Sequence, residues 1–458
     1  SGVTKKVFLK FLDSLAPETT YTINFGNSIK DNKENNPLTF FSYTFSTGET
    51  IDSLYIRGNT KDAFSQESDE FISLQLYRVD SLFKDSIVFQ NKPTYISNTL
   101  DSTNYKFQNL KEGKYLLIAL KDVDNNYLFD PYYDKIGFID SMITLPRDSV
   151  IDLKLFKEET EIIWDKPHFI NSEKIGFGYY GKLDLDKIKI ESNIPDSVNY
   201  VFIKEKETDT LNLWLSRNSF DSLNFSLIET DTIKLTTVKF DRKRDSLIDS
   251  LNINSKTVNV IHLKESFKIS SNIPLNKIED SLITIRDIDS LIIPFTTSIN
   301  DRLDEIDIDF EVSPSDDYSI FIKPRAIKDI RGTENDSLQF NVVSQTLEDY
   351  GNVFLDVISN NDSKYILHLL DSNSNIIREF NNVTNSTYTF DYIRPGKYTF
   401  RLIEDLNSND IWDTGNYLKQ VQPEPVYYFP SELDVRANWD LNETFNLNLL
   451  NSLKDSIN

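Results

Sequence analysis

Cysteine is absent from this 458-residue chain, and that absence removes several kinds of chemistry at once. Disulfide bonds, thiolate zinc sites and cysteine nucleophiles are all excluded. Histidine is scarce: His168, His262 and His368 lie far apart, and none has a second histidine two or four residues away. Without such a pair a zinc hydrolase is not expected, and no GxSxG, GxGxxG or GxxxxGK motif indicates a serine hydrolase or a nucleotide cradle. We therefore expect no enzyme, although paired carboxylates stay open because 72 acidic residues make any pair uninformative.

Alanine and long apolar runs are also missing. Alanine occurs at only five positions, whereas Ile, Phe, Tyr, Thr and Val are plentiful, a mixture that disfavours helices and suits half-buried strands. No apolar stretch approaches the 18 or so residues of a membrane span. Ser1 does not look like a natural start and the first residues have the pattern of a strand inside a domain. We expect a preceding segment that carries targeting information.

Positive charge is in short supply, with 49 basic against 72 acidic residues and a net charge of −23. Nucleic acid needs a basic footprint on its protein partner, so no nucleic-acid binding is expected. Direct docking of the protein surface on anionic lipid is disfavoured for the same reason. The acidic surface is explained by solubility alone, or by contact with divalent cations or basic partners.

The most informative positive feature is a hairpin that occurs twice. Gly113 to Asp130 reads GKYLLIALKDVDNNYLFD, and Gly396 to Asp413 reads GKYTFRLIEDLNSNDIWD. Both have a tyrosine-bearing strand that runs into a loop with Asp or Asn at alternate positions. Two such stretches so far apart predict a domain type that is used twice.

A second pattern also repeats. Tyr21 to Asp31 reads YTINFGNSIKD, and Tyr318 to Asp329 reads YSIFIKPRAIKD, with one residue inserted. Alternation of apolar and polar residues predicts strands throughout, so we predict an all-β chain of tandem β-sandwich domains. The predicted units are residues 1–48, 49–157, 158–256, 257–345 and 346–458, and the third of these has the weakest pattern. Such a chain is expected to form a rod or an arc.

The two Asp/Asn loops are the candidate metal sites. Calcium takes six to eight oxygen ligands, and alternate oxygen side chains with a position-7 carbonyl supply about five, as in the first part of an EF-hand loop. Positions 1, 3, 5, 7 and 9 of the two loops are Asp122, Asp124, Asn126, Leu128 and Asp130, and Asp405, Asn407, Asn409, Ile411 and Asp413. Position 6 is not Gly and position 12 is not Glu. Two interpretations stay open: a turn that hydrogen-bonds to itself, or a site in which Ca²⁺ stiffens the loop.

Position 8 of each loop is aromatic, Phe129 in the first and Trp412 in the second. We expect both rings to insert into the core of their own domain. The chain has four tryptophans, Trp164, Trp214, Trp412 and Trp439, which could form a sugar-binding platform but are more often core or interface residues.

Two resemblances refine these predictions. Residues 19–48, TTYTINFGNSIKDNKENNPLTFFSYTFSTG, resemble the C-terminal half of a bacterial Ig-like domain found in Bacteroidota envelope proteins, and residues 318–345 resemble it more weakly. The stretches GKYLLIALKD and GKYTFRLIED resemble the transthyretin-like, or carboxypeptidase-regulatory-like, β-sandwich. The resemblance makes residues 1–48 the C-terminal part of an Ig-like domain, 158–256 and 257–345 Ig-like sandwiches, and 49–157 and 346–458 transthyretin-like sandwiches. Together with the ending WDLNETFNLNL, the module order is similar to that of Ig-like-domain lipoproteins of flavobacteria and relatives.

That resemblance implies a signal peptide and a lipid-anchoring cysteine upstream, and hence an outer-membrane location at the cell surface or on the periplasmic face. It also implies a structural or interaction subunit of an outer-membrane protein assembly or export complex. The expected partners are an outer-membrane β-barrel protein and other envelope lipoproteins. The alternative is a cell-surface adhesin or glycan-binding protein, for which a concave aromatic patch would be the sign.

Overall fold

The computed structural model describes residues 8–11, 14–26, 28–31, 33–38, 41–81, 83–147, 150–171, 173–185, 188–206, 208–216, 221–229, 232–239, 250–360 and 362–449. Within these ranges nearly every element is a strand, and the helical turns are the short segments η1 (Asp85–Phe89), η2 (Asp280–Leu282), η3 (Leu347–Asp349) and residues 447–449. The predicted fold class, a tandem array of β-sandwich domains, is confirmed. No helix in the described ranges has the length and apolarity needed to cross a membrane.

The second domain packs two sheets around one core. One sheet has the order β10-β3-β6, with β10 parallel to β3; the other has the order β5-β4-β7-β8, with β9 paired to β7. Its strands are β3 (Leu54–Asp62), β4 (Ser73–Arg78), β5 (Tyr95–Asn98), β6 (Asn104–Leu110), β7 (Gly113–Lys121), β8 (Lys135–Phe138), β9 (Ile143–Leu145) and β10 (Leu153–Leu155). β7 is the hairpin strand that the repeat singled out, and both of its faces are buried. Its odd residues from Tyr115 to Ala119 enter the inter-sheet core, whereas Leu116, Ile118 and Leu120 enter a second cluster on the outer face.

The fifth domain repeats this topology strand for strand. Its sheets have the orders β33-β30-β37, with β37 parallel to β30, and β32-β31-β34-β35, with β36 paired to β34. Its strands are β30 (Gly351–Ile358), β31 (Lys364–Asp371), β32 (Ile376–Val383), β33 (Ser386–Ile393), β34 (Gly396–Asp405), β35 (Val426–Tyr428), β36 (Leu433–Val435) and β37 (Asp440–Asn446). The matched tyrosines make the same bond: the Tyr115 hydroxyl donates to Lys111 O at 2.8 Å, and the Tyr398 hydroxyl donates to Arg394 O at 2.9 Å. β37 pairs with β30 along its full length and ends at Asn446, because residues 447–449 turn into a helix.

The third and fourth domains are also two-sheet sandwiches. The third has the orders β11-β13-β16-β15, with β12 on β13, and β14-β17-β18; the fourth has β19-β21-β26-β25 and β20-β29-β27-β23-β24, with the small pair β22-β28. The strands of the third are β11 (Ile163–Trp164), β12 (His168–Asn171), β13 (Lys174–Tyr180), β14 (Ile188–Ser192), β15 (Tyr200–Lys204), β16 (Thr210–Leu215), β17 (Ser222–Glu229) and β18 (Thr232–Lys239). The strands of the fourth are β19 (Ile253–Ser255), β20 (Val260–Ile261), β21 (Phe267–Ser271), β22 (Leu275–Ile278), β23 (Ile283–Arg286), β24 (Ile292–Ile293), β25 (Phe295–Ile299), β26 (Glu305–Phe310), β27 (Asp317–Ile322), β28 (Ile327–Asp329) and β29 (Leu338–Ser344). β19 pairs with β21, so residues 253–255 pack as part of the fourth domain.

The N-terminal piece is a two-stranded sheet of β1 (Thr20–Asn24) and β2 (Ser42–Ser46). It is attached to the second domain through polar contacts. Asp52 N donates to Thr20 Oγ1 at 2.9 Å, and Lys111 Nζ donates to Glu18 O at 3.3 Å.

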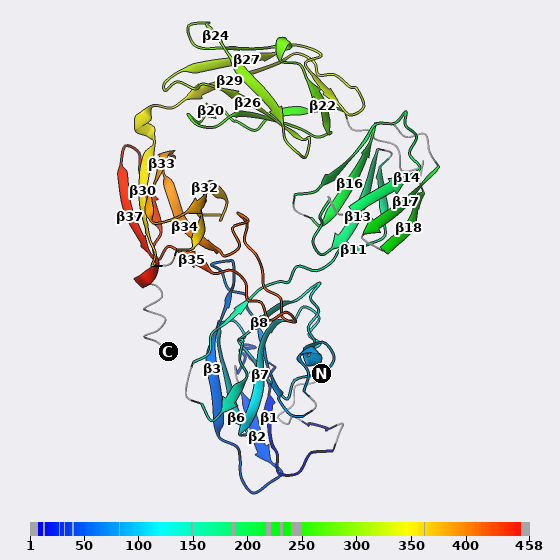
Figure 1. The fold of residues 1–458 in the computed structure, drawn as a ribbon, viewed down its shortest axis with the longest axis vertical. Coiled ribbons are helices and arrows are strands. Elements are labelled where there is room, and N and C mark those ends of the chain that lie inside the picture. Colours follow the sequence, from blue (N-terminus) through cyan, green and yellow to red (C-terminus); the bar gives the residue numbers. More distant parts are fainter. Residues whose placement is uncertain are drawn as a thin grey trace.

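The four complete domains form a closed ring and not the expected rod or arc (Figure 1). Sequential neighbours meet through small junctions. Tyr133 and Tyr180 join the second and third domains edge to face with ring centroids 5.3 Å apart, and Arg331 joins the fourth to the third through Glu173 Oε2 at 3.2 Å. His262 Nε2 donates to Tyr392 O across 2.6 Å, joining the fourth domain to the fifth. The ring closes because the loop after β34 returns to the second domain, a contact that no local pattern in the sequence indicates.

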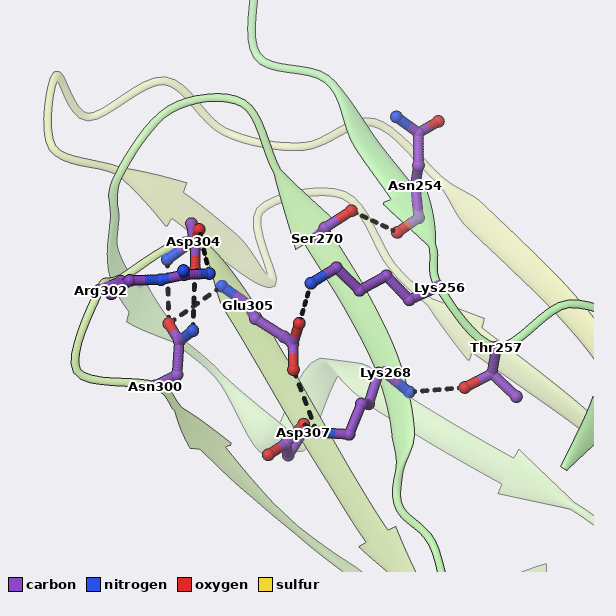
Figure 2. Close-up of polar contacts among 10 residues, drawn as sticks. All are labelled: Asn254, Lys256, Thr257, Lys268, Ser270, Asn300, Arg302, Asp304, Glu305 and Asp307. Carbon is purple, nitrogen blue, oxygen red and sulfur yellow. Dashed lines mark hydrogen bonds and ion pairs between the residues drawn. The ribbon is translucent and has the colours of Figure 1, made fainter. Parts of the chain in front are cut away.

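The sheet β19-β21-β26-β25 of the fourth domain carries a network of paired charges (Figure 2). Glu305 on β26 contacts both Lys256 and Lys268, and Lys268 also lies 3.1 Å from Asp307. Burial opposes the charged form of Lys268, but its bonds to Asp307 and Glu305 dominate and raise its pKa. Glu305 and Asp307 are therefore paired with lysines, which makes this part of the sheet a salt-bridged surface.

Candidate functional site

The first Asp/Asn loop folds onto its own backbone. Asp122 accepts the backbone N–H groups of Asn126 and Tyr127 at 3.1 and 2.7 Å, and the Asn126 side chain accepts the N–H of Leu128 at 2.7 Å. Asp134, which was not among the predicted residues, accepts the N–H groups of Val123 and Asp130 at 2.9 Å each. Asp134 is buried, and this burial raises its pKa despite the two backbone bonds.

The second loop is built in the same way. Asp405 accepts the N–H groups of Asn409 and Asp410 at 3.1 and 3.0 Å, and Ile411 N donates to Asn409 Oδ1 at 3.0 Å. The place of Asp134 is taken by Glu424, which accepts the N–H groups of Leu406 and Asp413 at 2.7 and 3.0 Å. Position 13, which is Asp134 in the first loop, is Tyr417 in the second, and the acid comes instead from the longer segment before β35.

Three of the predicted ligands meet directly in the second loop. The amide nitrogens of Asn407 and Asn409 donate to Asp413 Oδ2 at 2.6 and 2.8 Å. In the first loop, Asp124 and Asn126 are exposed and Asp130 Oδ1 accepts the N–H of Tyr132 at 2.9 Å. The side chains of Leu128 and Ile411 carry no oxygen, so these positions could offer only their carbonyls.

The backbone of the two loops is the same at the positions that decide the turn. Positions 4 and 6 have positive φ in both: 56° and 64° at Asn125 and Tyr127, and 59° and 62° at Ser408 and Asp410. An EF-hand loop uses Gly at position 6 for its sharp turn. The departure at position 6 therefore changes the residue but keeps the left-handed conformation.

Within the described ranges, no group of three or more acidic or histidine side chains is arranged as a metal site. Most of the predicted side-chain oxygens accept hydrogen bonds from the loops themselves, as the self-bonded interpretation requires: those of Asp122, Asn126, Asp130, Asp405, Asn407, Asn409 and Asp413. Calcium binding at the ten positions stays a prediction.

The segment that follows the second loop closes the ring. Tyr417 is fully buried between the two domains, and its hydroxyl donates to Asp85 O in the second domain at 2.9 Å. Its ring lies edge to face with Phe138, with centroids 5.3 Å apart, and its backbone N–H donates to Glu158 Oε1 at 2.5 Å. Burial raises the pKa of Tyr417 well above its ordinary value, so the phenol stays protonated and donates.

Close packing beside Tyr417 depends on a glycine. A Cβ placed on Gly415 would come within 2.6 Å of Phe156 Cζ and 2.7 Å of Val421 O. Gln422 adds a polar anchor, since its Nε2 donates to Phe138 O at 3.1 Å and to Asp140 Oδ1 at 2.7 Å. The segment that closes the ring is therefore held in three ways. The Tyr417 ring is buried against the second domain, the backbone at Gly415 packs closely because it has no side chain, and Gln422 bonds to the second domain.

A second part of the same contact centres on Phe64 of the second domain. Trp412 packs on Phe64 with ring centroids 4.7 Å apart, and the Arg401 guanidinium lies 4.2 Å from the Phe64 ring centroid. The Tyr428 hydroxyl donates to Phe64 O at 2.9 Å. Trp412 was expected in the core of its own domain; this is wrong, because it packs against the second domain. Phe129, its counterpart, is buried in its own domain as expected.

Arg401 is held by His368 on the neighbouring strand. Arg401 Nε and Nη2 lie 3.1 and 2.9 Å from His368 Nδ1, and His368 Nε2 lies 2.9 Å from Glu379 Oε2. Arginine can only donate, so Nδ1 accepts and Nε2 carries the proton. Burial first, and then the charge of Arg401, hold the pKa of His368 below its ordinary value.

The three histidines and four tryptophans do not gather. His168 is exposed on β12, His262 bridges the fourth and fifth domains, and His368 lies under the ring-closing contact. The tryptophans are likewise in separate places: Trp164 is buried in the third domain, Lys174 lies over Trp214, Trp412 is in the interface and Trp439 is exposed beside Arg436. They do not form a shared aromatic platform.

Comparison with known proteins identifies one module. Residues 1–47 match the bacterial Ig-like domain family. With the sandwiches described above, the match shows a multi-domain protein that contains an Ig-like module. No curated protein matches the chain.

Several solved structures match over much of the chain, but with low sequence identity and low TM-scores. The major pilin subunit BcpA of Bacillus cereus is 11% identical, with 86% of this chain and 99% of that chain covered and a TM-score of 0.16. The surface layer protein SbsC, domains 4–9, is 8% identical over 86% of this chain and 64% of that chain, with a TM-score of 0.19. The BSP domain of a biofilm-associated protein is 8% identical over 78% and 94%, with a TM-score of 0.17.

Proposed function

We propose that this chain is a non-enzymatic envelope lipoprotein that serves as a structural and interaction subunit of an outer-membrane protein complex. The observation that carries the proposal is the closure of the ring through Tyr417. Domains joined only by short linkers move relative to one another by default. A buried contact between the second and fifth domains couples four sandwiches into one frame, which suits a subunit that holds partners in fixed positions.

The chemistry of the side chains supports a scaffold over an enzyme. The histidines that could act as bases lie in three separate domains. Both ring nitrogens of His368 are already hydrogen-bonded, one to Arg401 and the other to Glu379. Glu305 and Asp307 in the fourth domain are paired with Lys256 and Lys268. The dispersed tryptophans likewise support a scaffold over the alternative, a glycan-binding adhesin, which would need aromatic rings on one surface.

The proposed partners are an outer-membrane β-barrel protein and other envelope lipoproteins, such as those of protein assembly or export machinery. With a net charge of −23, the surface is repelled by anionic headgroups. Attachment to the membrane is therefore proposed to depend on an N-terminal lipid and on the barrel partner.

Affinity purification from native membranes in mild detergent tests this function. We expect a β-barrel protein to be recovered in a defined ratio with the wild-type chain and with Tyr417→Phe, which keeps the ring. Tyr417→Ala, which opens the ring, should recover less. Recovery of the wild-type chain alone would overturn the proposal, and binding on a glycan array without a barrel partner would favour the adhesin.

A further inference from the structure

Arg401 is a buried cation that lacks a carboxylate partner. The residue is 6% exposed, and its guanidinium donates to His368 Nδ1 and lies over the ring of Phe64 in the second domain. Among the residues that the structure describes, no Asp or Glu forms an ion pair with Arg401; the carboxylate of this network, Glu379, contacts the other nitrogen of His368. A buried charge is normally compensated by an opposite charge. Here a neutral imidazole is the acceptor that keeps the guanidinium in place.

Protonation of His368 would remove this acceptor. Nε2 already carries the proton that bonds to Glu379, so an added proton must go to Nδ1, which lies 2.9 Å from Arg401 Nη2. Arginine does not lose its charge in proteins, so two cations would then be in contact in a buried place, where the repulsion between them is strong. The bond from Nε2 to the Glu379 carboxylate becomes stronger when the imidazole is charged. His368 is therefore held where it is, and Arg401 is the group that leaves.

Loss of Arg401 weakens the contact that closes the ring. Phe64 of the second domain packs against two groups of the fifth: the Arg401 guanidinium lies 4.2 Å from its ring centroid, and the centroid of the Trp412 ring lies 4.7 Å away. A cation over an aromatic ring stabilises most where water is excluded. When the guanidinium moves away, Phe64 loses that contact and keeps the one with Trp412. Closure becomes weaker, whereas the strands of both domains keep their pairing.

Three charged groups lie around His368. Arg401 on β34 and Glu379 on β32 flank it on the two neighbouring strands. From the second domain, Asp62 accepts the N–H of Phe64 at 2.8 Å and is paired with a lysine of its own domain. Asp62 is thus already engaged and does not supply a counter-charge for a protonated His368.

The acid at the other end of the ring-closing contact responds in the opposite direction. Glu158 accepts the Tyr417 N–H, and burial raises the pKa of its carboxyl. A carboxyl whose pKa is raised in the closed ring binds a proton more readily there than when it is solvent-exposed, so its protonation favours closure. Tyr417 stays protonated throughout, because burial raises its pKa. Opening in mild acid is therefore expected from His368 and not from these two groups.

His262, at the junction of the fourth and fifth domains, is bonded differently. Its Nε2 donates to Tyr392 O across the junction, and its Nδ1 accepts the N–H of Lys264 within the fourth domain. A proton added at Nδ1 leaves the Nε2 bond in place, and Glu265 Oε1, 3.9 Å from Nδ1 and paired with Arg394, faces the new charge. Burial also holds the pKa of His262 below its ordinary value. This junction therefore keeps its bond in mild acid.

We propose that His368 and Arg401 make the ring proton-sensitive: in mild acid the contact between the second and fifth domains opens, while the junction between the fourth and fifth domains stays closed. Burial, and then the charge of Arg401, hold the pKa of His368 below its ordinary value of about 6.5. The closed ring therefore keeps its full stability above about pH 6.5 and loses stability as the pH falls below that value. The four domains then change from a ring into an open arc. The switch depends on the ring itself, whatever its partners are.

Hydrogen exchange at the Tyr417 amide measures this opening directly, because that N–H donates to Glu158 across the ring-closing contact. Protection factors, corrected for the intrinsic exchange rate at each pH, should be compared at about pH 7.5 and about pH 5.5. We expect Tyr417 protection to fall several-fold at the lower pH, with a ceiling of about tenfold set by a histidine pKa of about 6.5 in the open ring. Amides of β30, in the core of the fifth domain, should keep their protection. Equal Tyr417 protection at the two pH values, or a fall that β30 shares, would overturn the proposal.

Matched histidine variants locate the response. In His368→Asn the side-chain oxygen takes the place of Nδ1 as acceptor but binds no proton, so the fall should disappear. In His262→Gln the amide nitrogen takes the place of Nε2 as donor, so the fall should remain. A fall that persists in His368→Asn, or that disappears in His262→Gln, would contradict the assignment to His368.

A third variant keeps the test decisive if His368→Asn does not fold. Arg401→Met removes the cation and keeps a long apolar side chain against Phe64. Protonation of His368 then meets no neighbouring positive charge, so the fall in Tyr417 protection should be smaller than in the wild type. An equal fall in Arg401→Met would show that opening does not depend on Arg401, and the proposal would then be wrong.

Discussion

Replacement of Tyr417 by alanine should open the ring while leaving each sandwich folded. The side chain is fully buried in a cluster whose other buried residues belong to the second domain. Truncation of a buried aromatic residue costs about 3–5 kcal/mol, including the cavity that it leaves. Loss of the bond to Asp85 O adds about 1 kcal/mol. The bonds made by Gln422 and by the backbone N–H of residue 417 survive and add nothing to the loss. The expected loss in the free energy of closure is therefore about 5 kcal/mol, roughly four-thousandfold in the closing equilibrium.

Because the chain contains no cysteine, two introduced cysteines can carry spin labels at single sites. Asn91 in the second domain and Asn373 in the fifth are exposed and suit this purpose. Pulsed dipolar spectroscopy should give one narrow distance for the wild type and for Tyr417→Phe, which loses only the hydroxyl bond. Tyr417→Ala should give a broad distribution that extends to longer distances.

An unchanged narrow distance in Tyr417→Ala would refute the reasoning, since it would mean that other contacts alone hold the ring. Far-UV circular dichroism provides the control for folding. A general loss of strand signal would show that the substitution unfolds a domain, and Gly415→Val would then test closure independently. Its side chain would meet Phe156 at the interface, so it should open the ring without removing an aromatic core residue.

Three further predictions concern other parts of the chain. The pKa of His368 lies below its ordinary value of about 6.5, so the folded protein binds this proton less readily than the unfolded protein does. The contribution of His368 to stability is therefore complete above about pH 6.5 and should be lost as the pH drops below that value. The curve of Tm against pH should be flatter in His368→Gln. If calcium binds the loops, calcium should raise Tm, chelator should reverse the rise, and Asp124→Asn should reduce it; no shift in either direction would remove the metal interpretation. Arg331→Ala should destabilise the fourth domain by about 3 kcal/mol in urea unfolding, because it leaves the fully buried Asp329 carboxylate without its cation, and a loss below 1 kcal/mol would contradict this role.

The repeated domains could be predicted from the sequence because the patterns that mark them are local. A strand that alternates apolar and polar residues, followed by a turn of fixed length, places its side chains by geometry alone. This is why the hairpins at Gly113 and Gly396 predicted a domain used twice, and why Tyr21 and Tyr318 marked a second repeated type. The bounds of the last strand, β37, could not be predicted in this way, because its parallel pairing with β30 depends on a strand about 90 residues away.

The structure of the two Asp/Asn loops could be predicted only in part from the sequence. Alternate Asp and Asn residues predicted an oxygen-lined turn, and the turn is there, with Asp122 and Asp405 as its first acceptors. The acids that complete each turn were missed. Asp134 and Glu424 stand at different distances from their loops, so no common spacing signals them; a buried acid accepting two loop N–H groups is visible only in three dimensions.

By itself the sequence determined the all-β class, the repeated modules and the turn chemistry, because each follows from side-chain periodicity over a few neighbouring residues. Only the tertiary structure decided that the chain closes on itself. Ring closure requires that Tyr417 meet Asp85 and that Trp412 meet Phe64, surfaces that are more than 300 residues apart. Each of these residues alone has the pattern of an ordinary buried aromatic residue. What they contact depends on the angles at three domain junctions, and small differences at each junction add up over the path from the second domain to the fifth.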